Sequence, residues 1–478
     1  MNRQTIQQIL AGLGTRPTRS LGQNFLHDEA AAREIVGMLE LTPEDHLVEI
    51  GPGLGALTEH AAGACRSMTL IEKDGRLAAW LAREWGDRLR VLHQDALEYD
   101  LRELFPHGPT KILGNLPYYI SSQVLLHFGS EPTPITRMVF TLQKEMAERL
   151  SAKPSTKAYG ALTLLVGRRW KVEYRRTLPG SAFLPAPNVE SGVVVLIPRE
   201  PGELPECGAR LFTRLVKDGF SQRRKMLRKM LAHHGLDWPA LCARLGVPET
   251  VRGEALSLEQ WIELTRIAEG AADTPEEQRQ GQDVHGEVFD VVDERDQVTG
   301  QQSRHEVHRR GLRHRAVHLF LFNKRGDLFL QKRSRWKDVH PGRWDSSAAG
   351  HLNAGDDYDA AAHRELGEEL GVSAPLEAFG TIAACEETGQ EFVRCYQGRH
   401  DGPFVWPRSE IETGAFFPLA VIERWIAARP EDFAEGFLVC YRLWKEHRAA
   451  DGVNDPADAG GGAAAAAADP EADDMTGE

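Results

Sequence analysis

The chain of 478 residues contains little cysteine and no long apolar run. Its six cysteines are scattered and never form a Cys-x-x-Cys pair, which argues against a disulfide framework or a zinc site built on paired cysteines. No apolar stretch reaches the roughly 18 residues that a membrane-spanning helix needs. The first residues also lack the apolar core of a secretory signal. We therefore expect a cytoplasmic protein with no membrane partner.

The length and charge distribution predict more than one folded domain. A chain of this size is too long for one ordinary core, and its 41% hydrophobic and 27% charged residues are typical of globular proteins. Residues 1–270 contain 34 basic and 31 acidic residues, whereas the remainder contains 23 and 39. The first part can therefore bind nucleic acid through local basic clusters, while the acidic second part should not do so over a broad surface.

Two segments of low apolar content divide the chain. Residues 269–284 are small, polar and charged without an apolar period, which indicates a linker. Residues 449–478 consist largely of Gly, Ala and acidic residues, and we expect this tail to be disordered. The remaining segments define the expected domains, at residues 1–200, 201–268 and 285–448.

The apolar pattern differs between these domains. Residues 30–200 alternate helical and strand-like patterns, as in a parallel, doubly wound α/β sheet. The expected strands lie at 46–50, 67–72, 90–93, 111–114, 138–142 and 193–198. Residues 206–268 show helical patterns alone, which predicts a small helical subdomain. Residues 287–447 form an expected α+β domain, with strands at 288–292, 316–322, 328–332 and 392–397 and helices at 358–370 and near 433–446.

A glycine-rich loop, Glu49-Ile50-Gly51-Pro52-Gly53-Leu54-Gly55, follows the first expected strand. Glycines allow a tight turn and a close approach of the backbone to a cofactor. Glu72 ends the next strand, where it could accept from both ribose hydroxyls, and Asp95 follows the strand after that, where it could accept from an adenine amino group. Either acid alone would be an ordinary exposed strand-end group, and the loop alone an ordinary tight turn. The ordered series favours S-adenosylmethionine as the cofactor.

The sequence Asn115-Leu116-Pro117-Tyr118 suits methyl transfer to an amino group on a nucleic-acid base. Such an amine is a poor nucleophile because its lone pair is conjugated with the ring. The Asn115 side-chain oxygen and the Leu116 carbonyl could accept its N–H bonds and favour a tetrahedral nitrogen. Pro117 holds Leu116 extended, which would aim that carbonyl, and Tyr118 offers a face for a flipped-out base. The alternative is a strand-to-loop turn with a buried tyrosine.

Over residues 10–268 the chain resembles the ribosomal RNA adenine dimethyltransferases of the bacterial small-subunit type. Besides the two motifs above, the resemblance is carried by Leu21–Leu26, Phe183–Pro187 and Phe220–Arg228. It implies a Rossmann-like methyltransferase fold with S-adenosylmethionine as methyl donor. The implied reaction is N6,N6-dimethylation of two adjacent adenines near the 3′ end of 16S rRNA, in the small ribosomal subunit or its precursor.

The same resemblance implies roles for individual residues. Phe183 matches a family aromatic residue that packs on the target base, and Tyr119 stands where many members have Asn. The implied cofactor contacts are Asn24, Leu26, Gly51, Glu72, Asp95 and Asn115.

Basic residues concentrate at 149–176 and 206–236, where they would neutralise RNA phosphates without selecting a sequence. They could also form ordinary solvated helix faces. Two other activities stay open for this half of the chain. It could methylate 23S rRNA, as the related antibiotic-resistance enzymes do, or act as a non-catalytic ribosome-assembly factor.

Three carboxylates, Glu365, Glu368 and Glu369, are spaced to share one face of a helix. Grouped like charges cost stability unless a cation lies between them. Mg²⁺ or Mn²⁺ prefers oxygen ligands and also bridges diphosphate oxygens. The alternative is a solvated acidic helix in which Arg364 and Glu368 form an i, i+4 pair.

From Gly350 to Val372 the sequence resembles the Nudix box, which implies metal-dependent hydrolysis of a diphosphate-linked small molecule. By resemblance, Glu368 and Glu369 are the principal metal ligands. Glu365 assists the metal or the attacking water, and Arg364 holds the carboxylates. Asp356 stands where the family has Glu, so its reach to Arg364 or the metal is an open question. Glu391 is a candidate for an additional carboxylate.

The segments 311–318 and 341–345 resemble the Nudix branch that is related to isopentenyl diphosphate isomerase. That isomerase needs a cysteine shortly before the Gly-His step of the box, where this chain has Ala349. Without a thiol the protonation chemistry lacks its acid/base group, so we favour hydrolysis over isomerisation or simple binding. The resemblance also implies that His314 and His351 could bind metal, although lone histidines are more often structural. We expect a monomeric, bifunctional enzyme.

Overall fold

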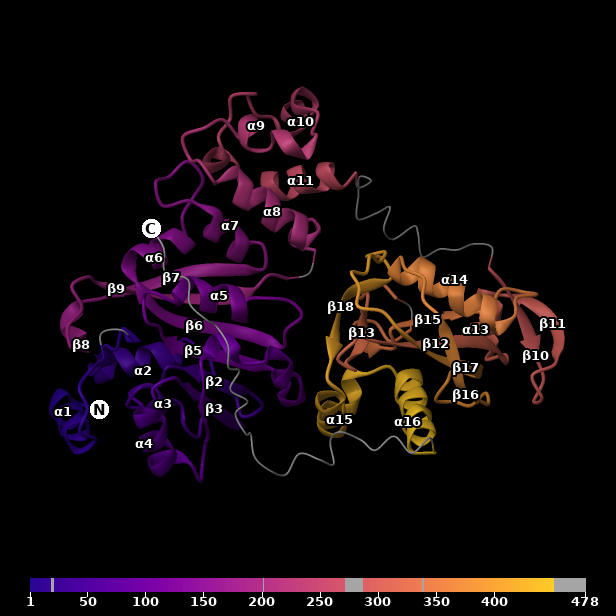
Figure 1. The fold of residues 1–478 in the computed structure, drawn as a ribbon, viewed down its shortest axis with the longest axis horizontal. Helices are drawn as coiled ribbons and strands as arrows, with labels where there is room; N and C mark the ends of the chain where they lie inside the picture. The colour runs from indigo at the N-terminus through magenta and orange to yellow at the C-terminus, as the bar shows by residue number, and fades with distance from the viewer. Residues whose placement is uncertain (19–20, 201, 271–286, 338, 451–478) are drawn as a thin grey trace, which may run out of the picture. The chain divides into compact units, whose positions relative to one another are not determined.

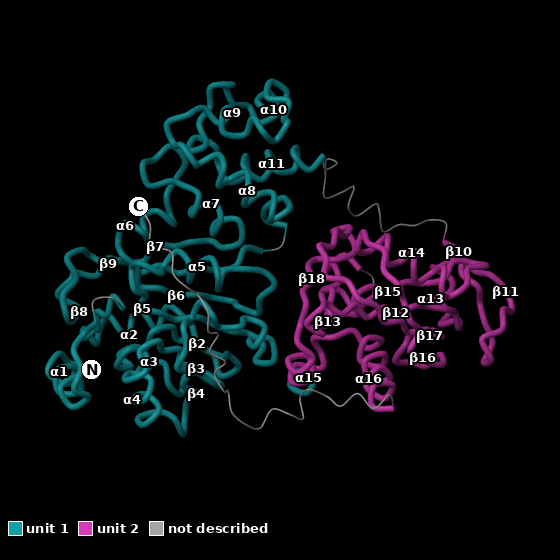
Figure 2. The backbone as a smooth tube through the Cα atoms, viewed as in Figure 1, with its two compact units in different colours: residues 1–283, 427–429 teal, residues 284–426, 430–478 magenta. Residues whose placement is uncertain are grey.

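The structure is a computed structural model that describes residues 1–18, 21–200, 202–270, 287–337 and 339–450. It divides into two compact units, Met1–Asp283 with Ala427–Arg429, and Val284–Ile426 with Pro430–Glu478 (Figure 2). Most of the predicted linker at 269–284 and of the predicted tail at 449–478 lies outside the described residues. Within the described ranges, no helix has both the length and the apolar character needed to cross a bilayer.

The first unit is built on a seven-stranded sheet of order β4-β3-β2-β5-β6-β9-β7 (Figure 1). Strands β4, β3, β2, β5 and β6 pair in parallel, β9 runs antiparallel to β6, and β7 runs antiparallel to β9. The strands are β2 (His46–Ile50), β3 (Ser67–Glu72), β4 (Arg90–His93), β5 (Thr110–Asn115), β6 (Ile135–Gln143), β7 (Trp170–Leu178) and β9 (Ser191–Pro198).

Helices cover both faces of this sheet, because successive strand residues point to opposite sides. On β2, Leu47 packs into one hydrophobic core and Val48 into the other. The first core includes helix α2 (Glu29–Gly37) and the second includes helix α5 (Ser121–Phe128). The other helices of this part are α1 (Arg3–Gly12), α3 (Thr58–Ala61), α4 (Gly75–Trp85), α6 (Lys144–Leu150) and α7 (Ala161–Gly167), and a small pair of strands is formed by β1 (Phe25–Leu26) and β8 (Phe183–Leu184).

The prediction of a wholly parallel sheet was wrong at one edge. The predicted strand at 193–198 is antiparallel β9, and its partner β7 was not predicted. Parallel neighbours need a crossover, usually an α-helix, whereas the 12 residues between β7 and β9 contain no α-helix. The remaining predicted strands pair in parallel as expected.

The helical subdomain contains α8 (Ala209–Gly219), α9 (Leu227–Met230), α10 (Trp238–Leu245) and α11 (Leu258–Glu269). Its core is not confined to residues 201–268, since Tyr159 and Leu164 are buried within it. The Tyr159 hydroxyl donates to the Leu256 carbonyl at 2.8 Å. The subdomain is therefore attached to the sheet domain by shared packing as well as by the chain.

The second unit is a mixed sheet of order β14-β13-β12-β17-β16, to which β15 and β18 add by pairing with β12 and β13. Val317 of β12 packs toward helix α14, whereas the neighbouring Phe320 contacts Phe437 of helix α16, so the two helices cover opposite faces. The strands are β10 (Val288–Val292), β11 (Val298–Ser303), β12 (His314–Phe322), β13 (Leu328–Arg333), β14 (Trp344–Asp345), β15 (Ala348–His351), β16 (Leu376–Ile382), β17 (Glu391–Arg399) and β18 (Ile411–Phe417), and the helices are α13 (Arg304–Arg310), α14 (Tyr358–Leu370), α15 (Leu419–Ala428) and α16 (Glu435–Ala450). The predicted fold classes of both halves, Rossmann-like α/β with a helical subdomain and α+β, are confirmed.

Candidate active sites

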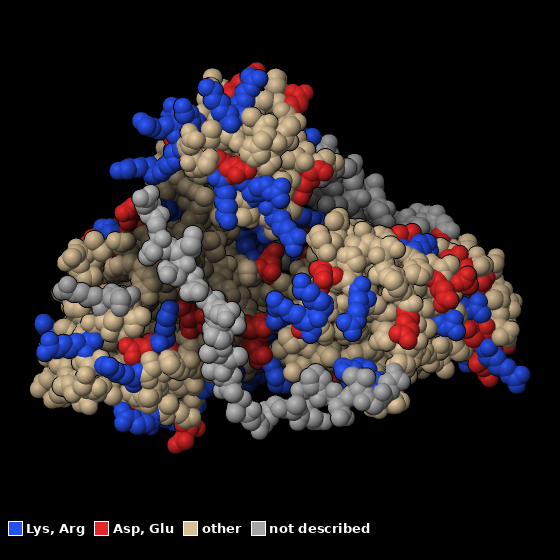
Figure 3. Space-filling view, viewed as in Figure 1, with Lys and Arg blue, Asp and Glu red and all other residues tan. Residues whose placement is uncertain are grey.

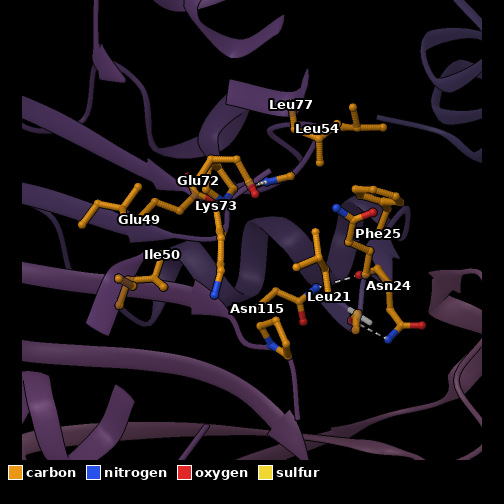
Figure 4. Close-up of a pocket in the computed structure, with 18 of the residues that line it drawn as sticks. Leu21, Asn24, Phe25, Glu49, Ile50, Leu54, Glu72, Lys73, Leu77 and Asn115 are labelled. Atoms are coloured by element: carbon orange, nitrogen blue, oxygen red, sulfur yellow. Dashed lines mark hydrogen bonds between the residues drawn. The ribbon is translucent and has the colours of Figure 1, made fainter. Parts of the chain in front are cut away.

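A pocket opens at the carboxyl ends of the parallel strands of the first unit (Figure 4). It is lined by residues from the loop after β2, the ends of β3 and β5, and the turn after β4, because these strand ends lie at one edge of the sheet. A segment before the sheet, Leu21–Leu26, closes another side. The pocket brings together all six predicted cofactor contacts: Asn24, Leu26, Gly51, Glu72, Asp95 and Asn115.

Glycine is required in the loop after β2. Gly51 and Gly53 have φ angles of +62° and +60°, which L side chains rarely adopt. A Cβ atom on Gly53 would also lie 3.0 Å from the Phe25 ring. Glu72 ties this loop in place, because its Oε2 accepts from the Gly53 N–H at 3.0 Å and its Oε1 from the Asp74 N–H at 2.9 Å. Burial raises the pKa of Glu72 despite these hydrogen bonds.

Asp95 forms an ion pair across the pocket wall. Its Oδ2 lies 2.6 Å from the Lys73 ammonium, and its Oδ1 accepts from the Leu97 N–H at 3.0 Å. The hydrogen bond from Lys73 lowers the pKa of Asp95, so the carboxylate is held ionised. Lys73 lines the pocket and was not predicted, although its place directly after Glu72 could have indicated it.

Glu49 is a second pocket residue to which sequence reasoning gave no role. It is 2% exposed, and its Oε2 accepts from the Thr58 hydroxyl at 2.6 Å. Burial raises its pKa to about 8. Its position as the first residue of the glycine-loop motif was the available signal.

The Asn115 amide is oriented by the segment before the sheet. Its Nδ2 donates to the Asn24 carbonyl at 2.9 Å, which leaves the side-chain oxygen available as an acceptor (Figure 4). Leu116 is buried, and its N–H donates to the Thr141 carbonyl at 3.0 Å. The neutral acceptor that the sequence predicted therefore has a fixed orientation at the pocket.

The predicted aromatic residues occupy different places. Tyr118 donates to or accepts from the Ser191 hydroxyl at 2.9 Å, and Phe183 is 3% exposed in β8, paired with Leu26. Leu116, Tyr118 and Phe183 do not belong to the pocket lining, whereas Tyr119 does and is 54% exposed. The exposed aromatic ring at the pocket thus belongs to Tyr119, which stands where many family members have Asn.

Lysine and arginine side chains gather on the helical subdomain (Figure 3). Several predicted phosphate contacts pair with acids, among them Arg169 with Glu131 and Arg223 with Glu254. Within the described part of the chain, a set of exposed basic residues has no acidic group within ion-pair distance: Lys153, Lys157, Arg224, Lys225 and Lys229. These side chains are available for an anionic partner.

In the second unit, the carboxylates of α14 pack against β15. Glu369 Oε2 accepts from the Ala349 N–H at 3.0 Å and from the Gln331 amide at 3.2 Å. A Cβ atom on Gly350 would lie 2.0 Å from the Glu365 carboxyl carbon, so this position needs glycine. Burial, together with the charge of Glu369, raises the pKa of Glu365 to about 7, and burial raises the pKa of Glu369.

Arg364 connects these acids to the strand. Its Nη1 donates to Glu365 at 2.8 Å and to Glu368 at 3.0 Å, and its Nη2 donates to the His351 carbonyl at 2.9 Å. The shorter Asp356 reaches only to 3.7 Å from Arg364 and accepts instead from the Asn353 N–H. Glu368 is largely exposed. Among the described residues, these three acids do not form a group whose ligand atoms all lie within 4.8 Å of one another, although carboxylate oxygens are the ligands that Mg²⁺ or Mn²⁺ prefers.

A separate histidine cluster is formed by His308, His314, His351 and Glu391. The ligand nitrogens of the three histidines lie within 4.8 Å of one another. Glu391 Oε1 lies 3.0 Å from His351 Nε2 and 3.5 Å from His314 Nε2, while His314 Nδ1 is 2.9 Å from the Leu312 carbonyl. The Nε2 atoms of His308 and His314 are buried without a hydrogen-bond partner. Sequence reasoning had singled out the other three residues but missed His308.

Two family models match the chain: "Ribosomal RNA adenine dimethylase" over residues 14–269 and "NUDIX domain" over residues 312–436. Ribosomal RNA small subunit methyltransferase A of Geobacillus kaustophilus is 37% identical over 273 residues, covering 54% of this chain and 93% of that protein. The protein of the same name from Vibrio cholerae is 39% identical over 255 residues, covering 53% and 93%. A dimethyladenosine transferase structure from Plasmodium falciparum is 23% identical with a TM-score of 0.42, covering 50% and 95%. The chain therefore belongs to the ribosomal RNA adenine dimethylase family, as an enzyme in which this domain is joined to a NUDIX hydrolase domain.

Proposed function

We propose that the first unit uses S-adenosylmethionine to dimethylate N6 of two adjacent adenines near the 3′ end of 16S rRNA, in the small ribosomal subunit or its precursor. The observation that carries this proposal is the Asn115 amide, whose nitrogen is bound to Asn24 and whose oxygen is left as an acceptor at the pocket. The similarity to the small-subunit methyltransferases supports the choice of RNA.

The pocket fits the proposed cofactor, which supplies an activated methyl group when bound. The glycine loop allows close backbone approach, and the Glu72 carboxylate ends β3 where ribose hydroxyls can reach it. The Asn115 oxygen and the Leu116 carbonyl would hold the two N–H bonds of the target amine. Tyr118 and Phe183 would stack on the base, which requires both rings to turn toward the pocket that they do not line in this structure. Because Lys73 already contacts Asp95, an adenine amino group would share or replace this contact.

A methyl-transfer assay on unmodified 30S subunits tests this proposal. Wild-type protein should add tritiated methyl groups that primer extension locates at two adjacent adenines. Asn115→Ala should slow transfer by about 100-fold or more, because one preorganised acceptor is lost. Preferential transfer to 23S rRNA in a parallel assay on unmodified 50S subunits, or unchanged transfer in the variant, would contradict the proposal, and absence of any transfer would favour an assembly factor.

We also propose that the second unit hydrolyses a diphosphate-linked small molecule with Mg²⁺ or Mn²⁺. Glu365, Glu368 and Glu369 would hold the ion, with Glu368 leaving Arg364 to do so. The ion, when bound, stabilises charge on the diphosphate and lowers the pKa of an attacking water. Glu365, which is buried beside Glu369, would assist the ion or accept a proton from that water.

Phosphate release from a panel of nucleoside and non-nucleoside diphosphates tests this second activity. Glu369→Gln should abolish Mg²⁺-dependent release from whichever compound is cleaved. Glu386→Gln, which changes an exposed carboxylate outside α14, is the matched control and should not. Absence of release by the wild-type chain across the panel would favour a binding module.

The histidine cluster favours a further metal site in this unit. We propose that His308, His314, His351 and Glu391 bind a transition-metal ion, since the Nε2 atoms of His308 and His314 are buried without a hydrogen bond and the three imidazoles converge. Imidazole nitrogens with one carboxylate suit zinc-like ions rather than Mg²⁺. Loss of one bound Zn²⁺ in His314→Ala would support this site, and equal zinc content would contradict it.

A further inference from the structure

Two histidines and an aspartate meet on the helical subdomain of the first unit, outside the cofactor pocket. Asp218 lies in the last turns of α8, and His233 and His234 lie in the 3-10 turn η5 (Ala232–His234) that follows α9. The Nε2 atoms of His233 and His234 lie 3.2 Å and 2.9 Å from the same Asp218 Oδ2. We call these three residues the histidine–aspartate cluster.

The spacing of these atoms suits a small metal ion. Metal–ligand bonds of about 2.0–2.1 Å in tetrahedral geometry place neighbouring ligand atoms about 3.3 Å apart. The two measured separations are only slightly shorter, and all three ligand atoms lie within 4.8 Å of one another. A small outward shift of the rings would therefore make room for an ion.

The cluster rests on a packed framework. Leu227, the first residue of α9, and Leu231, which follows this helix, are buried in the core of the subdomain, as are Leu215 and Val216 of α8. The Asp218 carbonyl accepts from both the N–H and the hydroxyl of Ser221, which fixes the end of α8. The backbone that carries the ligands is thus held before any ion binds, which reduces the ordering cost of binding.

The two imidazoles differ in exposure, and this leaves one side of the cluster open. The His234 side chain is 10% exposed, whereas that of His233 is 63% exposed. An ion with three protein ligands keeps a coordination position for water or an anionic oxygen. The exposed Arg224, Lys225 and Lys229 lie in the neighbouring chain segment. They repel a bare cation but attract an anion that could fill this position.

We propose that the histidine–aspartate cluster binds one divalent transition-metal ion of the zinc class through two imidazole nitrogens and one carboxylate oxygen. This donor set favours Zn²⁺ or Co²⁺ over Mg²⁺, which prefers oxygen ligands alone. If RNA binds this face, as the basic residues at 206–236 predict, a backbone phosphate oxygen could fill the open position. The metal site itself does not depend on that function.

Two N–H donors that share one carboxylate oxygen would give the same distances without a metal. The number of bound ions therefore distinguishes the metal site from a pair of hydrogen bonds. The full-length chain is dialysed against Co²⁺ in excess Mg²⁺ at pH 7.5, and bound cobalt is measured by elemental analysis. Asp218→Asn and His233→Ala should each bind one equivalent less than the wild type. His93→Ala, which removes a lone exposed histidine of the same unit, is the control and should bind as much as the wild type.

Equal cobalt binding by the wild type and both cluster variants would overturn the proposal. Sites in the second unit contribute equally to every sample, because the substitutions leave that unit unchanged. Circular dichroism in EDTA checks folding, and His233→Ala decides if Asp218→Asn is unfolded, since His233 is largely exposed.

Discussion

At the scale of single residues, the buried Glu49 carboxyl makes the stability of the first unit depend on pH. The folded chain keeps this proton up to about pH 8, whereas an unfolded glutamate releases it near its ordinary value of 4.5. The folded state therefore binds more protons between these values, and the contribution of Glu49 to the free energy of unfolding falls as pH rises through this window.

Glu49→Gln should remove this dependence while keeping an acceptor for the Thr58 hydroxyl. At pH 9 we expect the variant to be more stable than the wild type by on the order of 2–4 kcal/mol, and at pH 4 to be equal to it. Urea unfolding followed by circular dichroism measures the difference. Glu44→Gln, at an exposed position, should show no such trend. A constant difference from pH 4 to 9 would refute the assignment.

Gly350 and Gly367 offer a matched pair in the second unit. A Cβ atom on Gly350 would overlap the Glu365 carboxyl, whereas a Cβ atom on Gly367, within α14, meets nothing within 4 Å. We expect Gly350→Ala to displace Glu365 and reduce diphosphate hydrolysis by about 100-fold or more. Gly367→Ala should keep activity and stabilise the helix by up to about 1 kcal/mol. Steady-state hydrolysis and thermal unfolding measure both, and similar activity in the two variants would contradict the role of Glu365.

At the scale of elements, helix α1 supports the cofactor pocket from outside the sheet. Ile6 is fully buried, packs in one cluster with Phe25, Leu54 and Leu77, and also lines the pocket. Ile6→Ala should cost about 2–4 kcal/mol of stability and weaken binding of S-adenosylhomocysteine. Ile9→Ala, at a partly buried position of the same helix, should have a smaller effect. Titration calorimetry tests this, and unchanged affinity in Ile6→Ala would show that α1 is not part of the site.

The sequence was sufficient for elements whose pattern is local. The buried strands β2 and β3, the half-buried strand β4 and the amphipathic helix α14 have the predicted bounds. Strand β7 was missed because its alternating charged residues lie at a sheet edge, where the same residues also suggested an RNA-binding stretch. Contacts between distant segments could not be inferred. The orientation of Asn115 depends on Asn24, 91 residues away.

The histidine cluster shows the same limit more sharply. His314 and His351 lie close together because β12 and β15 pair with Ala316 opposite His351. This register cannot be predicted from the sequence of either segment alone. His308 joins them from α13, where it had no distinguishing signal. Long-range register therefore decides which of several plausible ligands converge.

At the scale of the whole molecule, two units with separate hydrophobic cores should respond to separate ligands. S-adenosylhomocysteine binds only the folded first unit under the proposed function, and Mg²⁺ with a phosphate-bearing product binds only the second. At a ligand concentration 100 times its Kd, the unit that binds should gain about 2.7 kcal/mol. Differential scanning calorimetry of the full chain should show each ligand moving a different transition to higher temperature. Asp95→Ala should abolish the first shift alone and Glu369→Gln the second alone. If either ligand moved both transitions together, or either substitution removed both shifts, the two units would unfold as one cooperative body.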